Sequence, residues 1–294
     1  MRAKQNISYT GLLYILPWLG GFLILQFVPL VNSLWYSVTN FQLIGSTKFV
    51  GFKNFIDIFT TDAQFWNSLK VTFLFVLIAV PLKILFALII AVMLNQKWGG
   101  INFFRTVYYM PSILGGSIAI SVLWRFLFMK QGVVNQMIAV IGMPALDWLG
   151  NPKIALFTVS LVTVWQFGSS MVLFLAGLKQ IPESLYEAAR IDGAGPMRIF
   201  FRITLPMLTP IVFFNLIMQM INAFQEFTTA FVITQGGPLK STYLYGLMLY
   251  EQGFKFFKMG YASALSWILF GIIFFFTSLT FKSSESWVHY GDTV

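Results

Sequence analysis

Six long apolar stretches constrain this chain more than any other feature. Each holds about 20 or more predominantly apolar residues, the length that a helix needs to cross the hydrocarbon core of a bilayer. They lie approximately over residues 11–36, 71–94, 107–128, 154–178, 207–233 and 261–281. Backbone groups in lipid must be paired within their own segment, and these runs are too long and too uniformly apolar for barrel strands. We therefore expect an all-α integral membrane protein with six transmembrane helices.

The composition agrees with lipid as the solvent of this chain. Hydrophobic residues make up 57% of the sequence and charged residues only 10%, more apolar surface than a soluble domain of 294 residues can hide. The longest segments between the apolar runs are about 25–35 residues, too short for a separate ligand-binding domain. We expect one transmembrane domain over residues 1–294, in contact with membrane lipid.

Several chemistries are excluded by what the sequence lacks. The chain has no cysteine and a single histidine, His289, so thiolate and multi-histidine metal sites are ruled out. The net charge is +9, but the basic residues are scattered between the apolar runs, which argues against a nucleic-acid partner. No Gly-Lys dipeptide occurs, so the chain has no phosphate-binding loop for ATP.

The distribution of charge bears on the orientation in the membrane. Arg2 and Lys4 precede the first run, which extends past the roughly 7–15 apolar residues of a signal peptide and has no small-residue cleavage site after it. The first run is therefore interpreted as a retained span, and six spans place both termini on one side. Lys and Arg are almost equally divided between the two sides, and only the longer outer loops favour cytoplasmic termini.

The segment 179–206, between the fourth and fifth spans, differs from the other connections. Pro182 and Glu183 favour the start of a helix, and Gly193 and Gly195-Pro196 favour its end. A second amphipathic piece, Met197 to Thr204, leads to Leu205-Pro206 and the next span. Periodicity leaves two interpretations open: a helix lying in the lipid headgroups, or a docking element for a soluble partner.

The same segment resembles the signature loop of ABC importer permeases. That pattern is Glu-Ala-Ala, three residues, Gly, nine residues, Ile, one residue, Leu-Pro. It is matched here by Glu187, Ala188, Ala189, Gly193, Ile203, Leu205 and Pro206. Other stretches resemble the carbohydrate branch of the family, which includes glycerol-phosphate importers: Phe104–Pro111, Trp148–Pro152, Thr234–Pro238 and Gly260–Ala264.

The resemblance implies a type I importer fold in which the loop is a cytoplasmic coupling helix. Glu187, Ala188, Ala189 and Gly193 would then contact the ATPase. The implied partners are a second homologous permease, two copies of a cytoplasmic ATPase that bind ATP and Mg, and an extracytoplasmic solute-binding protein. The chain would be a non-catalytic subunit without a cofactor of its own, in a bacterial or archaeal cell membrane.

The resemblance favours a carbohydrate substrate, an oligosaccharide in particular, with a glycerol-phosphate compound as the alternative. A stand-alone secondary transporter is the rival interpretation from another class. Such a carrier often shows internal repeats, which we do not find, and has no use for a coupling loop.

Polar residues inside the spans are candidates for the substrate path. Asn215, Gln219, Asn222 and Glu226 follow one another at intervals of four, three and four, which places them on one stripe of a helix. One interpretation is hydrogen bonding between helices that holds the bundle together. The other is a stripe that faces the path and binds sugar hydroxyls. Both remain open on the sequence.

Two further polar residues, Lys83 and Gln166, each have more than one interpretation. Lys83 follows Pro81 in the second run, where it would pair with Glu226, face a water-filled cavity, or reach back to the membrane interface. Gln166 lies in the fourth run and is a further candidate for the path, although small polar groups there also serve packing.

Overall fold

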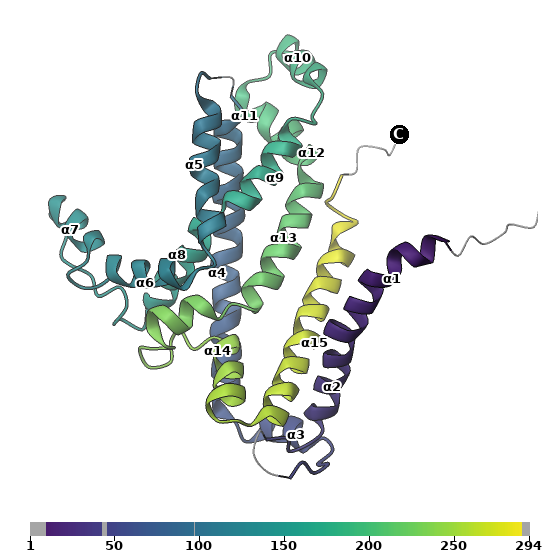
Figure 1. Ribbon diagram of the computed structural model, residues 1–294. Coiled ribbons are helices and arrows are strands. Elements are labelled where there is room, and N and C mark those ends of the chain that lie inside the picture. Colours follow the sequence, from purple (N-terminus) through teal and green to yellow (C-terminus); the bar gives the residue numbers. More distant parts are fainter. Residues whose placement is uncertain (1–9, 43–45, 97, 290–294) are drawn as a thin grey trace, which may run out of the picture. The chain divides into compact units, whose positions relative to one another are not determined.

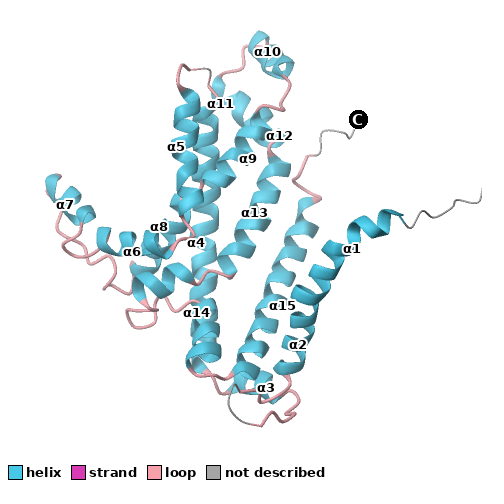
Figure 2. Ribbon diagram, viewed as in Figure 1, coloured by secondary structure: helices cyan, strands magenta, loops and turns pink. Residues whose placement is uncertain are grey.

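The computed structural model describes residues 10–42, 46–96 and 98–289, and its regular structure in that part is helical (Figures 1 and 2). A single isolated bridge joins Thr39 and Phe49 within it. The chain divides into two compact units, Met1–Asp62 with Leu249–Phe270, and Ala63–Met248 with Gly271–Val294. The predicted all-helical fold is confirmed. The prediction of one domain over residues 1–294 stays a prediction, and Arg2 and Lys4 lie outside the described residues.

The first unit contains the first predicted span. Helix α1 (Thr10–Phe22), the π-helical turn η1 (Leu23–Phe27) and α2 (Val28–Ser37) follow one another without a break. Residues Leu13–Ser37 are long and apolar enough to cross a membrane. The unit also holds α3 (Lys53–Thr60), the end of α14 (Tyr245–Tyr250), the turn η4 (Glu251–Lys255) and the start of α15 (Met259–Ser284).

The turn after α2 is held by hydrogen bonds to its backbone carbonyls. The side-chain amide of Asn54 donates to the carbonyls of Ser37 and Thr39, each at 2.8 Å. The Gly260 N–H donates to the Phe41 carbonyl at 2.9 Å, and a side chain at Gly260 would collide with the Thr39 carbonyl. Glycine is therefore required where α15 begins, because the two backbones approach each other closely.

The second unit is built around α4 (Ala63–Leu94), a helix of 32 residues. It begins eight residues before the predicted second span, and Pro81 does not interrupt it. The unit also contains the start of α14, the end of α15 and the helices α5 (Ile101–Leu114), α6 (Ile118–Leu127), α7 (Val133–Val140), α8 (Ala155–Trp165), α9 (Gly168–Leu178), α10 (Glu183–Ile191), α11 (Pro196–Ile199), α12 (Leu205–Met207) and α13 (Thr209–Phe224). Helix α4 packs along α8, α9 and α13.

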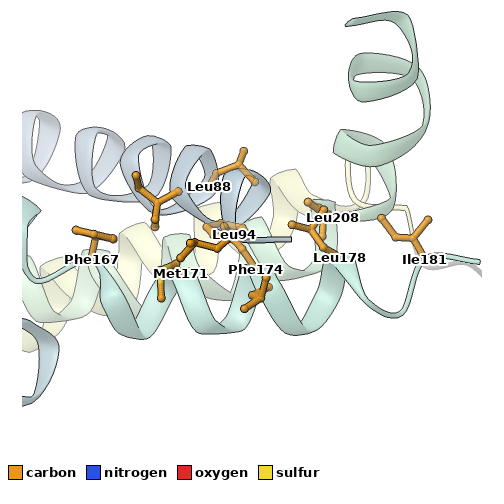
Figure 3. Close-up of a cluster of buried hydrophobic side chains, with 12 residues drawn as sticks. Leu88, Leu94, Phe167, Met171, Phe174, Leu178, Ile181 and Leu208 are labelled. Carbon is orange, nitrogen blue, oxygen red and sulfur yellow. The ribbon is translucent and has the colours of Figure 1, made fainter. Parts of the chain in front are cut away.

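A cluster of buried apolar side chains joins these helices near the end of α4. Leu88 and Leu94 of α4 meet Met171, Phe174 and Leu178 of α9 (Figure 3). Ile181 and Leu208 belong to the same cluster, so it includes one residue near the start of the predicted coupling loop and one just after its end. We call this set the anchor cluster.

The third and fourth predicted spans are bent pairs of helices rather than single rods, and a further bend lies where the predicted coupling loop enters the fifth span. Helices α5 and α6 meet at 104°, α8 and α9 at 48°, and the segment Pro196–Met207 meets α13 at 63°. Among the described residues, three helices alone are long enough to cross a membrane, or up to six if each bent pair is one span. The fifth predicted span also ends early, because α13 stops at Phe224, and residues 230–234 form the separate turn η3.

Candidate functional site

Helix α10 has the boundaries that its sequence predicts. Pro182 precedes it with an extended backbone (φ −58°, ψ 131°), and Glu183 stands in its first turn. Arg190 stands in its last turn. An acidic residue at the N-terminus and a basic one at the C-terminus complement the helix dipole, which stabilises this short helix.

Gly193 ends α10 with a left-handed backbone, at φ +75°. Its N–H donates to the Arg190 carbonyl at 3.0 Å, and the Ala194 N–H donates to the Ala189 carbonyl at 2.9 Å. These two bonds form a Schellman motif, in which glycine is favoured because a Cβ atom is strained at positive φ. The glycine of the signature pattern thus sets the direction in which the chain leaves the helix.

The outer part of the loop is open to a partner. Glu187 and Ala188 are exposed, Ala189 is half-buried, and no residue of α10 is buried. Two large apolar side chains beside them, Ile191 and Met197, are 86% and 73% exposed. Small alanines flanked by exposed apolar side chains are typical of a surface that another protein covers.

The inner part of the loop is attached to the helix bundle. Leu205 packs against the anchor cluster, and Ile203 and Pro206 are half-buried. The Tyr186 hydroxyl lies 3.2 Å from the Thr204 hydroxyl, which joins α10 to the turn η2 (Phe200–Thr204). The seven signature residues therefore divide into an exposed set on α10 and its cap, and a packed set at the start of the fifth span.

A cavity of about 870 Å³ lies between α10 and the end of α4. Its wall includes Asn95, Lys179, Tyr186, Arg190 and Thr204. Nearby, the Arg105 guanidinium caps the C-terminus of α4, because its Nη2 donates to the Leu94 carbonyl at 2.8 Å.

The polar stripe of the fifth span is divided by the fold. Asn215 and Gln219 are buried, with exposed fractions of 0% and 8%. The Gln219 amide donates to the Ser170 hydroxyl of α9 at 3.1 Å, and the Asn215 amide donates to the Ile211 carbonyl at 3.0 Å. Both side chains lie within the bundle of this chain, where Gln219 bonds between helices. The Asn215 amide oxygen is buried and has no hydrogen-bond partner among the described residues.

The other two stripe residues have different environments. Asn222 is exposed on α13, whereas Glu226 lies two residues beyond the end of that helix. The Glu226 carboxylate accepts hydrogen bonds from the Thr229 N–H at 3.0 Å and the Thr229 hydroxyl at 2.9 Å. Glu226 therefore caps the turn that follows, and the predicted four-residue stripe on one helix is wrong at this last position.

Lys83 is buried well inside α4, with 7% of its side chain exposed. It interacts electrostatically with Glu226 but forms no ion pair within 4.0 Å among the described residues. A side chain that reaches the membrane interface is expected near a helix end, whereas Lys83 lies in the middle of α4.

Gln166 connects two of the helix breaks. Its side-chain amide donates to the Gly115 carbonyl at 2.7 Å, and its own carbonyl accepts from the Ser112 hydroxyl at 3.0 Å. The Ser112 hydroxyl also accepts from the Ser169 N–H at 2.9 Å. Sequence reasoning missed Ser112 and Gly115 as partners of Gln166. In the sequence, the Gly115-Gly116 pair indicates a helix break, but nothing near it indicates the contact with Gln166.

Metal-binding chemistry finds no support in the part of the chain that the structure describes. No group of three or more His, Asp or Glu side chains is placed there to hold an ion. The arrangement instead offers an exposed helix, α10, on a packed base.

Known proteins share both the sequence and the fold. Residues 69–283 match the family described as binding-protein-dependent transport system inner membrane component. The chain is 48% identical over 292 residues to the probable ABC transporter permease protein YesP of Bacillus subtilis (strain 168), covering 98% of this chain and 94% of the relative.

More distant relatives have named substrates. The sn-glycerol-3-phosphate transport system permease protein UgpA of Yersinia pestis bv. Antiqua (strain Antiqua) is 33% identical, covering 98% of each chain. The trehalose/maltose transport system permease protein MalF of Thermococcus litoralis is 32% identical, covering 96% of this chain and 95% of the relative. A chain from the crystal structure of a bacterial alginate ABC transporter with alginate pentasaccharide-bound periplasmic protein has the same fold, with a TM-score of 0.78, 24% identity and 97% of each chain covered.

Proposed function

We propose that this chain is the permease subunit of an ATP-driven carbohydrate importer. The proposal starts from its family: the chain belongs to the binding-protein-dependent transport system inner membrane components. With a second homologous permease it would form the path through the membrane. An extracytoplasmic binding protein would deliver the sugar, and two copies of a cytoplasmic ATPase would supply the energy.

The observation that carries this proposal is the division of the signature loop. Glu187, Ala188 and the Gly193 cap are exposed and free for a partner, while Leu205 is attached to the anchor cluster. A displacement applied to α10 by an ATPase would therefore reach α9 and α13. Helix α9 contributes Phe174 to the cluster, and Leu208 of the cluster directly precedes α13. ATP and Mg would bind to the partner, and this chain would remain non-catalytic.

This role also fixes the orientation that we propose. The loop 179–206 must face the compartment that contains ATP, so both termini would lie in the cytoplasm of a bacterial or archaeal cell, with the chain in the cell membrane. The connections after the first and fifth spans would then lie outside, where the binding protein docks.

For the substrate path we propose Asn222 as the first polar contact on α13. It is the exposed member of the stripe, and a path formed between two permeases must be lined by side chains that this chain alone leaves uncovered. Glu226 would contribute its remaining carboxylate oxygen. Asn215, Gln219 and Gln166 would act through packing, because their polar groups contact other helices of this chain or are buried.

A glycerol-phosphate substrate is the second candidate, favoured by the likeness to the UgpA permease. A phosphate group requires a cation on the path, and Lys83 is the cation buried within this bundle. The Glu226 carboxylate near it would repel a phosphate, which makes a neutral sugar the better fit.

The test is to extract the tagged chain from its native membrane in mild detergent and to identify the co-purified proteins by mass spectrometry. We expect an ATPase, a second permease and a solute-binding protein, and ligand screening of that binding protein then distinguishes a sugar from a phosphate ester. Replacing Asn222 by Leu should lower uptake of that ligand while leaving the assembly intact.

A matched pair of glycine variants tests the coupling role. Gly193→Asp adds a side chain at positive φ on the exposed cap, whereas Gly195→Asp adds the same charge at φ −71°, with open space around it. We expect loss of ATPase recovery for the first alone. A chain that comes out alone, with transport unaffected by Gly193→Asp, would rule out the importer and leave a stand-alone transporter.

A further inference from the structure

An open pocket of about 530 Å³ lies within the first unit, away from the coupling loop in the sequence. Its wall comes from the connections after the first and fifth spans, and includes Asn40, Phe41, Asp57, Gln252 and Tyr261. Its volume falls in the range of about 300–1,000 Å³ that is usual for small-molecule sites. The role proposed above does not use this pocket.

The polar groups of the pocket are balanced in charge. Lys53 and Lys258 face the same space as Asp57 and Asp62, so the formal charges cancel. Lys53, Asp57 and Lys258 form no ion pair within 4.0 Å in the part of the chain that the structure describes. Ammonium and amide groups supply donors and carboxylates supply acceptors, and a sugar hydroxyl can use both because it donates and accepts.

The Gln252 side chain, which lines the pocket, carries an acceptor without a donor. The Gln252 amide oxygen is buried and has no hydrogen-bond partner among the described residues. A buried polar atom without a partner is unfavourable, so the side chain gains a hydrogen bond if it turns its amide toward a hydroxyl in the pocket. This oxygen is the observation that distinguishes the pocket from a merely solvated polar surface.

Aromatic side chains give the pocket a partly apolar wall. The ring of Phe41 stacks on that of Tyr36, with 4.3 Å between the centroids. The Tyr261 hydroxyl donates to Asp62 at 2.7 Å, which holds the ring and this carboxylate in place. Fixed rings beside amides and carboxylates form a site for a ligand with apolar C–H surfaces and hydroxyl edges.

We propose that this pocket binds one neutral sugar residue at the outer end of the first unit. The choice of a sugar rests on the proposed importer function, which also places the connections after the first and fifth spans on the outer side. The site would be distinct from the path lined by Asn222, and it would hold sugar at the membrane surface independently of the binding protein.

The experiment uses the purified importer in lipid nanodiscs without its binding protein. Saturation-transfer NMR is recorded with maltotriose, trehalose and sucrose as neutral probes and an alginate trisaccharide as the acidic probe. The variants Gln252→Leu and Asp57→Asn each remove one polar contact of the pocket. Lys255→Gln is the matched control, because Lys255 is exposed, pairs with Glu251 at 2.9 Å and does not line the pocket. Asn222→Leu reports on the path.

We expect a signal from at least one neutral sugar, unchanged in Lys255→Gln and reduced about fivefold or more in both pocket variants. No signal from any neutral probe, a signal from the alginate trisaccharide alone, or a signal removed only by Asn222→Leu would overturn the proposal. Monodisperse elution of each variant shows that it is folded. Failure of the importer function itself is read separately, from the absence of an ATPase in the co-purified proteins.

Discussion

The two halves of the loop 187–206 carry one sequence pattern but have opposite environments. In the first half, Glu187 and Ala188 are exposed and Gly193 has open space around it. In the second half, Leu205 packs against the anchor cluster and the following Leu208 is fully buried. The first half can change partners without disturbing the bundle, whereas the second half is part of the bundle. A coupling element needs both properties, because it must be reached by another protein and must transmit force.

The largest expected effect lies at Leu208, directly after the packed half. Leu208→Ala removes a fully buried side chain from the anchor cluster and should lower the free energy of unfolding by about 2–5 kcal/mol. The measurement is thermal or denaturant unfolding of the purified chain in detergent. Leu185→Ala, on the 40% exposed Leu185 of α10, is the control and should change stability far less. Equal losses in the two variants would show that α10 is packed as tightly as the cluster.

The next effect concerns the cap of α10. Gly193→Ala should introduce about 1–2 kcal/mol of backbone strain at φ +75°, while Gly195→Ala, at φ −71° and also in open space, should introduce none. Hydrogen exchange of the Ala194 amide, which bonds to the Ala189 carbonyl, measures the loosening directly. Substrate-stimulated ATPase activity of the assembled importer should fall in the first variant only. Slow exchange at Ala194 in both variants would contradict the Schellman motif.

A smaller effect is expected where the two halves meet. Tyr186→Phe removes the contact between the Tyr186 and Thr204 hydroxyls and should cost about 0.5–1.5 kcal/mol of stability. The Thr204→Val variant removes the other partner, so the double variant should lose little more than either single one. Additive losses in unfolding measurements would show that the two hydroxyls act independently.

The smallest effect on stability belongs to Glu187. Its carboxylate is exposed, so Glu187→Gln should change the free energy of unfolding by less than about 0.5 kcal/mol. It should still lower ATPase recovery in the pull-down by a few-fold, because the charge is placed to contact the partner. Glu183→Gln, one helical turn earlier, changes net charge equally and should have a weaker effect. Equal reductions would assign the loss to net charge alone.

Local patterns predicted the boundaries of elements better than their environments. Pro182 and Gly193 placed both ends of α10, since capping depends on residues next to each other in the chain. The two prolines Pro81 and Pro111 do not predict helix ends in the same way. Helix α4 continues through Pro81, whereas the chain after Pro111 bends by 104° at Gly115-Gly116. The bend depends on Gln166, which lies 51 residues from Gly115 and bonds to its carbonyl.

The sequence by itself determined that the chain is a helical membrane protein with the signature loop of an importer permease. Stretches of about twenty predominantly apolar residues are typical of helices that cross a bilayer, and the spacing from Glu187 to Pro206 is a local property of the chain. Only the tertiary structure decided which polar residues are available to a ligand. Asn215, Gln219 and Asn222 share one helix and similar chemistry, yet the neighbouring helices bury the first two and leave the third exposed. Burial is set by contacts between segments far apart in the sequence, which no local spacing records.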